Sequence, residues 1–351
     1  MNNLRIGYWP NSRSLDAPGD RRRLIFYLEN KGLDYEIYNP SRRYDLVYLS
    51  QAADITQIKK IKKTGAKIFY DNIDSYSSEG PTFQSFLRGT IRYFMGQNQY
   101  PIFNYPNYLN NIALPNVDAV VCASEEQLNI AKTFSSNVFC IPDHTFRENI
   151  SFKTDYLSKK IINIGWEGLG SNVYQLNILK DVLKEYSKTH EFNLHVITDK
   201  FSYKYMNRFL KIDIEKSLKK ISKSIIFHEW KESSYSSILT SCDFAIIPID
   251  LNSKMASGKP ENKLINMWKM GIPVIASRTS SYKRVMSDCN LDLLCKTKIE
   301  WVDKLRMLSD NSDLRKIVAK KAYNYAMQNY SQDAVIGKWD KMFNIFLDDS
   351  L

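Results

Sequence analysis

The chain has 351 residues, 44% hydrophobic and 25% charged, which excludes a long disordered protein and favours two domains of ordinary size. The formal net charge of +11 indicates an anionic partner, but no zinc-finger, KH or RRM signature accompanies it, so nucleic acid is not expected. No run reaches roughly eighteen apolar residues, and residues 1–13 lack a signal-peptide core, so we expect a cytoplasmic protein.

Short β-branched runs alternate with longer amphipathic stretches throughout, as expected of βα units around a parallel sheet. In the first half the predicted strands are residues 4–9, 35–39, 45–50, 66–71, 118–123 and 137–142. The predicted helices are residues 20–31, 53–64 and 124–134. The lysines at 59–63 fall at helical spacing, which favours a solvated helix face over a groove for nucleic acid.

Residues 142–160 lack periodicity and read as the connection between two domains. Strands are then predicted at 161–165, 193–198, 224–230, 243–248, 272–277 and 291–295. Helices are predicted near 172–188, 205–220, 232–241, 260–270, 297–308 and 311–328. The last segment places Ile336, Trp339, Met342, Phe343 and Phe346 on one helical stripe that must cover a core.

This pattern predicts an α/β protein with two doubly wound, Rossmann-like domains, at residues 1–148 and 149–329, with a terminal helix at about 330–351. The five cysteines show no C-x-x-C spacing, so neither a disulfide framework nor a zinc site is indicated. The fingerprints G-x-G-x-x-G and Walker A are both missing from the sequence, which disfavours a nicotinamide enzyme and a P-loop kinase.

The stretch 243–277 is a predicted strand, a loop rich in Ser, Lys and Gly, a helix and a Gly-x-Pro-Val turn. Gly258 lets the backbone approach a ligand, and the helix beginning near Pro260 directs its free N–H groups at the loop. Three lysines, Lys254, Lys259 and Lys263, would add positive charge for a phosphate, and Asn266 lies one turn after Lys263. The alternative is a solvated loop before a helix that packs through Met267 and Met270.

This stretch resembles the family 4 retaining glycosyltransferases of the GT-B fold, and especially those that build bacterial surface polysaccharides. The residues that carry the resemblance are Asp243, Pro248, Gly258, Lys259, Lys263, Asn266, Gly271, Pro273, Val274, Ala276 and Ser277. Asn266 departs from the family, in which a glutamate commonly binds the ribose. The resemblance implies a cleft between the two domains and a last helix that crosses back to the first domain.

Upstream, the sequence Ile-Gly-Trp-Glu-Gly at 164–168 resembles the family's strand end at the start of the second domain. Gly165, Trp166 and Gly168 would line the cleft floor; the alternative is a tight turn with Trp166 in the core. The predicted donor-binding residues are Gly165, Trp166, Gly168, Lys254, Ser257, Gly258, Lys259, Glu261, Asn262, Lys263 and Asn266.

In the first domain, Asp71 and Asp74 follow a strand in a pattern that resembles the family's cleft edge, and they are the predicted catalytic residues. A cap and turn before the next helix is the alternative. Acceptor contacts are predicted for the loop after the first strand, at Gly19, Asp20, Arg21 and Arg22. A helix cap with an exposed arginine run explains these four equally well.

The segment 82–97 mixes aromatic and aliphatic residues with Arg88 and Arg92, as helices at a membrane interface do. It is the candidate for peripheral contact with an anionic membrane at the inner face of the cell membrane. The alternative is a helix packed on its own core.

If the resemblance holds, the chain transfers a sugar from a nucleotide-sugar donor to a hydroxyl of a glycan or lipid-linked acceptor, with retention. We expect no cofactor and no required metal, and UDP or GDP as the donor nucleotide in preference to CMP. The alternatives are a non-catalytic GT-B-fold partner or sugar-nucleotide-binding subunit, and an epimerase or phosphorylase on the same scaffold.

Overall fold

The computed structural model describes residues 4–78, 83–144, 150–157, 160–204 and 210–347. Contacts divide the chain into two compact units. Unit 1 comprises Met1–Thr145, Gly258–Asn262 and Tyr330–Leu351, and unit 2 comprises Phe146–Ser257 and Lys263–Asn329.

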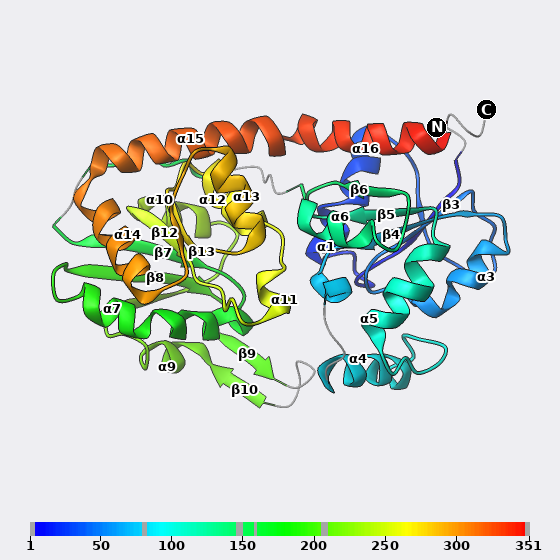
Figure 1. The fold of residues 1–351 in the computed structure, drawn as a ribbon, viewed down its shortest axis with the longest axis horizontal. Coiled ribbons are helices and arrows are strands. Elements are labelled where there is room, and N and C mark those ends of the chain that lie inside the picture. The colour runs from blue at the N-terminus through cyan, green and yellow to red at the C-terminus, as the bar shows by residue number, and fades with distance from the viewer. Residues whose placement is uncertain (1–3, 79–82, 145–149, 158–159, 205–209, 348–351) are drawn as a thin grey trace. The chain divides into compact units, whose positions relative to one another are not determined.

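Unit 1 is built on a six-stranded parallel sheet in the order β2-β1-β3-β4-β5-β6. Strands β3, β4, β5 and β6 are labelled in Figure 1. Its strands are β1 (Ile6–Trp9), β2 (Glu36–Ile37), β3 (Leu46–Leu49), β4 (Lys67–Asn72), β5 (Ala119–Cys122) and β6 (Val138–Cys140). Its helices are α1 (Pro18–Arg21), α2 (Leu24–Lys31), α3 (Ile58–Lys62), α4 (Phe83–Phe94), α5 (Tyr105–Tyr108), α6 (Glu125–Ala131) and α16 (Gln332–Leu347). Short 3-10 or π turns lie at Ile55–Gln57, Ser75–Ser78, Leu109–Ala113 and Leu114–Asn116.

The two faces of this sheet are covered by different helices, because successive strand side chains point to opposite sides. Leu46 and Tyr48 of β3 pack in a core with α2 and α16, whereas Val47 and Leu49 pack in a second core with α3, α5 and α6. The terminal helix α16 buries Trp339 against unit 1. The prediction that the last apolar stripe belongs to the first domain is therefore confirmed.

Unit 2 repeats the arrangement with a six-stranded parallel sheet in the order β11-β8-β7-β12-β13-β14. Its strands are β7 (Ile162–Glu167), β8 (Phe192–Thr198), β11 (Ile225–Glu229), β12 (Phe244–Ile247), β13 (Val274–Ser277) and β14 (Leu294–Cys295). Its helices are a 3-10 helix (Gly170–Leu179), α7 (Lys180–Tyr186), α9 (Ile214–Leu218), α10 (Tyr235–Ser241), α11 (Lys254–Ser257), α12 (Asn262–Lys269), α13 (Ser280–Asp288), α14 (Lys298–Asp310) and α15 (Ser312–Tyr330). Both sheets confirm the predicted class of two doubly wound α/β domains.

A hairpin stands where the sequence predicted a helix over 205–220. Strands β9 (Phe201–Lys204) and β10 (Leu210–Asp213) pair antiparallel, and only Ile214–Leu218 is helical within the described part of that segment. The Lys211 ammonium lies 3.7 Å from the centre of the Phe201 ring, a contact between strands that helical periodicity does not anticipate. Among the described residues, no helix combines the length and apolarity needed to cross a bilayer.

Candidate active site

The carboxyl end of β4 in unit 1 carries a buried ion pair. Arg23, whose side chain is 0% exposed, donates from Nε to both oxygens of Asp71 at 2.7 and 2.8 Å. Burial raises the pKa of Asp71 to about 6, and Arg23 opposes this rise. Because the Asp71 carboxylate is buried and engaged by Arg23, it is held in place as part of the sheet edge.

The same guanidinium joins β4 to the segment after β6. Arg23 Nη1 donates to the carbonyl of Ile141 and to Asp143 Oδ1, each at 2.9 Å. The second oxygen of Asp143 accepts from Asn262 Nδ2 at 2.8 Å. Within unit 1, Asn262 is therefore tied to the buried arginine through one carboxylate.

Asp74, three residues beyond Asp71, lies in a turn that two glutamines hold. Gln51 Oε1 accepts the backbone N–H groups of Ile73 and Asp74 at 3.1 and 2.7 Å, and Gln127 Nε2 donates to the Ile73 carbonyl at 2.6 Å. Burial raises the pKa of Asp74, while the charge of Lys259, also in unit 1, lowers it. Asp74 is half-buried, so its side chain is more accessible than that of Asp71.

The loop after β1 is organised by the buried carboxylate of Asp20. It accepts from Tyr8 Oη at 2.5 Å, from the backbone N–H of Asn11 at 2.7 Å and from that of Ser12 at 3.0 Å. Gly19 sits against Ile73, because a Cβ added there would lie 2.9 Å from Ile73 Cδ1.

The two other residues predicted for the acceptor, Arg21 and Arg22, differ in exposure. Arg21 is exposed and Arg22 is half-buried, with its carbonyl accepting the N–H of His144 at 2.8 Å. Of the three consecutive arginines, the structure therefore leaves Arg21 most open to a ligand.

In unit 2 a lysine lies at the carboxyl end of β7. Lys263 Nζ donates to the carbonyl of Glu167 at 2.7 Å and lies 5.0 Å from the centre of the buried Trp166 ring. A Cβ at Gly168 would lie 2.7 Å from that ammonium, so only glycine leaves room for it there. The structure thus brings together three predicted donor-site residues, Lys263, Gly168 and the buried Trp166.

Asn266 follows Lys263 by one turn on α12. It is half-buried, and its Oδ1 accepts no hydrogen bond from the part of the chain that the structure describes. Burying an amide oxygen without a hydrogen-bond partner costs free energy, so this oxygen is available to accept a hydrogen bond from a ligand hydroxyl.

Gly165 has a different environment from Gly168. A Cβ there would lie 2.9 Å from Leu239 Cδ2, so the lack of a side chain at Gly165 allows α10 to pack closely on β7.

The loop between β12 and α12 is fixed at its start and is exposed further on. Ser277 Oγ accepts the N–H of Ile249 at 2.8 Å, and Gln175 Oε1 accepts that of Asp250 at 2.6 Å. Lys254, at the start of α11, is exposed, and Ser257 ends that helix half-buried.

The next segment, Gly258–Asn262, belongs to unit 1. Lys259 is exposed, and Glu261 is buried and accepts from Tyr330 Oη at 2.5 Å. Like Asn262, Glu261 is therefore engaged by side chains of unit 1.

The sequence analysis did not single out four residues that hold these groups in place, namely Arg23, Gln51 and Asp143 in unit 1 and Gln175 in unit 2. Asp143 and Gln51 do follow predicted strands, which is a usable signal. By contrast, nothing local separates Arg23 from Arg21 and Arg22 except its place directly before an apolar helix.

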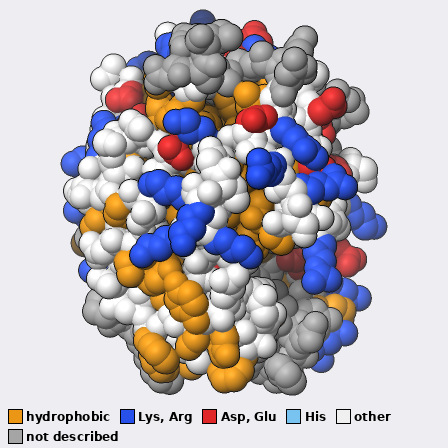
Figure 2. Space-filling model, turned by 90° about the vertical axis from the view of Figure 1, so that its right-hand side faces the viewer, with side chains coloured by type: hydrophobic (Ala, Val, Ile, Leu, Met, Phe, Trp, Pro, Cys, Tyr) orange, Lys and Arg blue, Asp and Glu red, His pale blue; other side chains and the backbone are white. Residues whose placement is uncertain are grey.

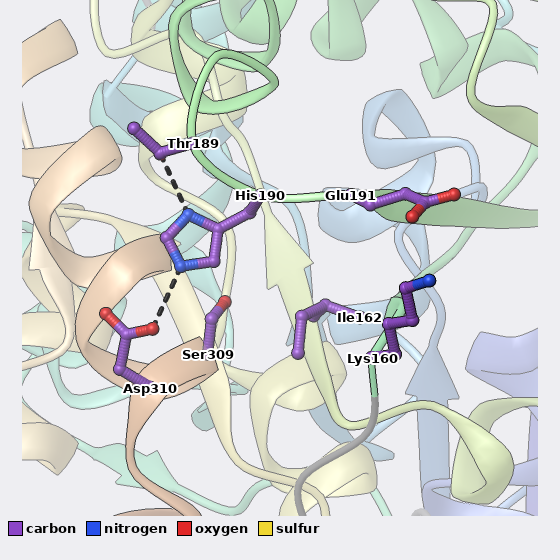
Figure 3. A pocket seen from close by; sticks show the side chains of 7 residues that line it. All are labelled: Lys160, Ile162, Thr189, His190, Glu191, Ser309 and Asp310. Carbon is purple, nitrogen blue, oxygen red and sulfur yellow. Dashed lines mark hydrogen bonds and ion pairs between the residues drawn. The ribbon is translucent and has the colours of Figure 1, made fainter.

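A cavity of about 320 Å³ lies at the opposite, amino-terminal edge of the unit 2 sheet (Figure 3). Here the His190 ring forms hydrogen bonds with Thr189 Oγ1 through Nδ1 and with Asp310 Oδ1 through Nε2, both at 2.9 Å. Its lining residues are Lys160, Ile162, Thr189, His190, Glu191, Ser309 and Asp310. Ligands of open α/β sheets sit at the carboxyl edge, and none of the predicted site residues lines this cavity.

No family model matches the sequence, and no curated protein matches it significantly. Solved structures do match it. Anabaena HepE, solved in complex with UDP-glucose, has a TM-score of 0.62 at 13% identity and covers 99% of this chain and 100% of its own. A glycosyltransferase from Rickettsia africae has a TM-score of 0.61 at 14% identity, covering 98% and 99%.

TarM matches with a TM-score of 0.60 at 13% identity over 91% of this chain, but the match spans only 57% of TarM. These likenesses confirm that the chain has the GT-B fold of glycosyltransferases.

Proposed function

We propose that this chain is a glycosyltransferase that moves a sugar from a nucleotide-sugar donor to a hydroxyl group, with retention and without a required metal. The observation that carries the proposal is the group formed by Lys263, Gly168 and Asn266 in unit 2. It combines a fixed ammonium, a glycine that leaves room beside it and an amide oxygen without a partner. A diphosphate next to a ribose matches that combination.

The leaving nucleoside diphosphate is the main electrostatic problem of the reaction, since negative charge grows on it as the sugar departs. We assign its stabilisation to Lys263, with Lys254 as a further cation and Ser257 as a polar neighbour, all three in unit 2. Asn266 is assigned to the ribose hydroxyls. Glu261 and Asn262 have partners in Tyr330 and Asp143, so we assign them to holding the segment in place.

Near the acceptor, we assign the substrate contact to Asp74 and a positioning role to Asp71. Asp71 is engaged by Arg23 at a buried site, whereas Asp74 is half-buried in a turn fixed by Gln51 and Gln127. Arg21 is assigned to the acceptor because it is exposed and lies two residues after Gly19, which packs against Ile73 of this turn. Assembly of a bacterial surface polysaccharide is the process that the sequence resemblance favours.

The test is to incubate the full chain with UDP- and GDP-sugars and to measure release of nucleoside diphosphate with and without glycan acceptors. We expect release from one donor, faster with an acceptor, and the same anomeric configuration in donor and product by NMR. Lys263→Ala should abolish release, and the same change at the exposed Lys320 should not. Binding of a nucleotide-sugar without any release would instead favour the sugar-nucleotide-binding subunit.

A further inference from the structure

The segment of unit 1 around α5 carries no charge. Residues 93–117 contain no Asp, Glu, Lys, Arg or His, although 25% of the whole chain is charged, and six of them are asparagines. Charged side chains normally occupy the exposed positions of a protein, and several residues of this segment are exposed. A surface that does without charge in a chain of this composition calls for a ligand that charge would not help to bind.

The inner side of this segment is fixed to the body of unit 1. The ring of the buried Tyr105 meets that of Tyr76 edge-on, with centroids 5.9 Å apart. Asn110, which is also buried, donates from Nδ2 to the carbonyl of Ser77 at 2.9 Å. Tyr76 and Ser77 follow Asp74 by two and three residues, so the uncharged segment is attached to the turn next to the proposed acceptor contact.

The outer side carries three exposed asparagines, which we call the amide row: Asn104, Asn107 and Asn111. Spacings of three and four residues place them on one side of the helical turns that begin with α5. Asn104 Oδ1 accepts the backbone N–H of Asn107 at 3.2 Å, and Asn111 Nδ2 donates to Asn107 Oδ1 at 2.9 Å.

These two hydrogen bonds fix the orientation of each amide in the row. Within the described ranges of the chain, Asn104 Nδ2, Asn107 Nδ2 and Asn111 Oδ1 have no hydrogen-bond partner. The amide row therefore offers two donors and one acceptor to a ligand. Hydroxyl groups match this set, because each can both donate and accept.

Aromatic rings flank the amide row. Phe103 is 62% exposed and stacks with the Phe86 ring, with centroids 5.7 Å apart. Tyr100 is 45% exposed, and its hydroxyl shares a hydrogen bond of 2.6 Å with that of Tyr108, which holds both rings in place. Tyr108 lies four residues after Asn104 and thus on the same side of the helical turns. Rings and amides together form one surface, which we call the amide–aromatic surface.

The figures show the setting of this surface within unit 1. Helices α4 and α5 lie at the lower right of Figure 1. Low on the face shown in Figure 2, hydrophobic side chains lie among white, uncharged atoms, below a group of Lys and Arg side chains.

We propose that the amide–aromatic surface binds a neutral glycan chain. A pyranose carries C–H groups on its faces, which stack on Phe and Tyr rings, and hydroxyls at its edge, which hydrogen-bond with amides. A polyanion or an anionic bilayer would be held by Lys and Arg, and interfaces between proteins are commonly enriched in Arg, yet residues 93–117 contain neither.

The position of the surface extends the inference to the acceptor. Because the segment is attached to the turn after Asp74, a glycan bound on it is the earlier part of the acceptor's own chain. The acceptor is then the end of an oligosaccharide or polysaccharide, and not a single sugar. This second conclusion rests on the proposed glycosyl transfer, whereas glycan binding by the surface does not.

The test is biolayer interferometry of the full chain on immobilised dextran, mannan and galactan, with heparin as the charged comparison, at low and high salt. We expect the chain to bind at least one of the three neutral polysaccharides, and equally well at both salt concentrations, because no charged group takes part. Binding to heparin should weaken as salt is added, since it depends on the net charge of the chain.

Phe103→Ser should lower the affinity for the neutral polysaccharide by about tenfold or more, because a stacking ring is lost. Its matched control is Phe152→Ser in unit 2, another exposed phenylalanine with an aromatic neighbour. Asn111→Ala should lower the affinity by about three- to tenfold through the loss of a hydrogen bond. Its control is Asn177→Ala, which is exposed and also donates to a carbonyl of the preceding turn. Every variant should keep the melting temperature of the unaltered chain, since all four side chains are exposed.

Two results would overturn the proposal: no binding to any of the neutral polysaccharides, or binding that Phe103→Ser and Asn111→Ala leave unchanged. Binding to heparin alone would be the first of these results and would identify net charge as its cause. In the transfer reaction, Phe103→Ser should raise KM for an oligosaccharide acceptor and leave KM for a monosaccharide acceptor unaltered; an equal change in both would refute the role of the surface in holding the acceptor.

Release of nucleoside diphosphate, measured in parallel, separates this proposal from the proposed function. Glycan binding without release from any nucleotide-sugar refutes the transferase and leaves the amide–aromatic surface standing. Release without glycan binding refutes the surface alone.

Discussion

Replacing Arg23 with methionine removes the buried cation at the carboxyl end of β4 and leaves an apolar side chain of similar length. Arg23 is 0% exposed and interacts with Asp71, Asp143 and the Ile141 carbonyl. The change leaves two carboxylates near each other in a dry environment without a cation. Breaking a buried ion pair from one side typically costs about 3–5 kcal/mol, and we expect a loss of stability in that range.

The loss should depend on pH. Burial already raises the pKa of Asp71 to about 6, and without Arg23 the pKa rises further. A carboxyl group whose folded pKa is raised adds stability below its unfolded pKa and loses it as the pH rises through the folded value. The loss of unfolding free energy in Arg23→Met should therefore be larger above the folded pKa of Asp71 than in acid, where the carboxyl is protonated.

The assay is urea unfolding followed by tryptophan fluorescence at several pH values. The matched control is Arg21→Met, two residues away and exposed, which should change the free energy of unfolding by no more than about 0.5 kcal/mol. A deficit for Arg23→Met below about 1 kcal/mol, or one equal to that of the control, would refute the assigned role of the buried arginine.

Two further predictions concern stability. Gly89→Ala should lower the free energy of unfolding by more than about 2 kcal/mol, because the added Cβ would clash with the Ile102 carbonyl. Gly337→Ala on α16, where a Cβ meets no other atom, should raise it by about 0.5–1 kcal/mol. Melting temperatures that shift in the same direction for both variants would contradict this. Burial lowers the pKa of His195 and of its partner His228 from 6.5, so the pair's contribution is complete above pH 6.5 and falls as the pH drops through the folded values. Changing both to glutamine should flatten the fall of melting temperature in acid, and an unaltered pH profile would refute the linkage.

Much of the fold follows from sequence periodicity. The alternation along Leu46–Leu49 places side chains on both faces of a buried strand, and the stripe through Trp339 marks α16 as part of the first domain's core. The hairpin of β9 and β10 was missed because its strands are short and its lysines suit an exposed helix equally well. The periodicity of a sequence segment does not reveal a contact between strands such as that of the Lys211 ammonium with the Phe201 ring.

The site was harder to predict than the fold, because a residue's role depends on which neighbours the chain brings to it. Arg21 and Arg23 look alike in sequence, yet one is exposed and the other is fully buried between two carboxylates. Asp71 and Asp74 share one motif, but Asp71 is buried against Arg23 whereas Asp74 is half-buried.

The measurement that tests the central claim most directly is a thermal-shift series with UDP, GDP, CMP, ADP and dTDP on the unaltered chain and on Lys263→Ala and Lys320→Ala. A ligand that binds only the native state raises the melting temperature. We predict that UDP or GDP stabilises the unaltered chain and the Lys320 variant, and that the shift disappears when Lys263 is lost. No shift with any nucleotide, or a shift that survives in Lys263→Ala, would contradict a donor site built on Lys263 at the end of β7.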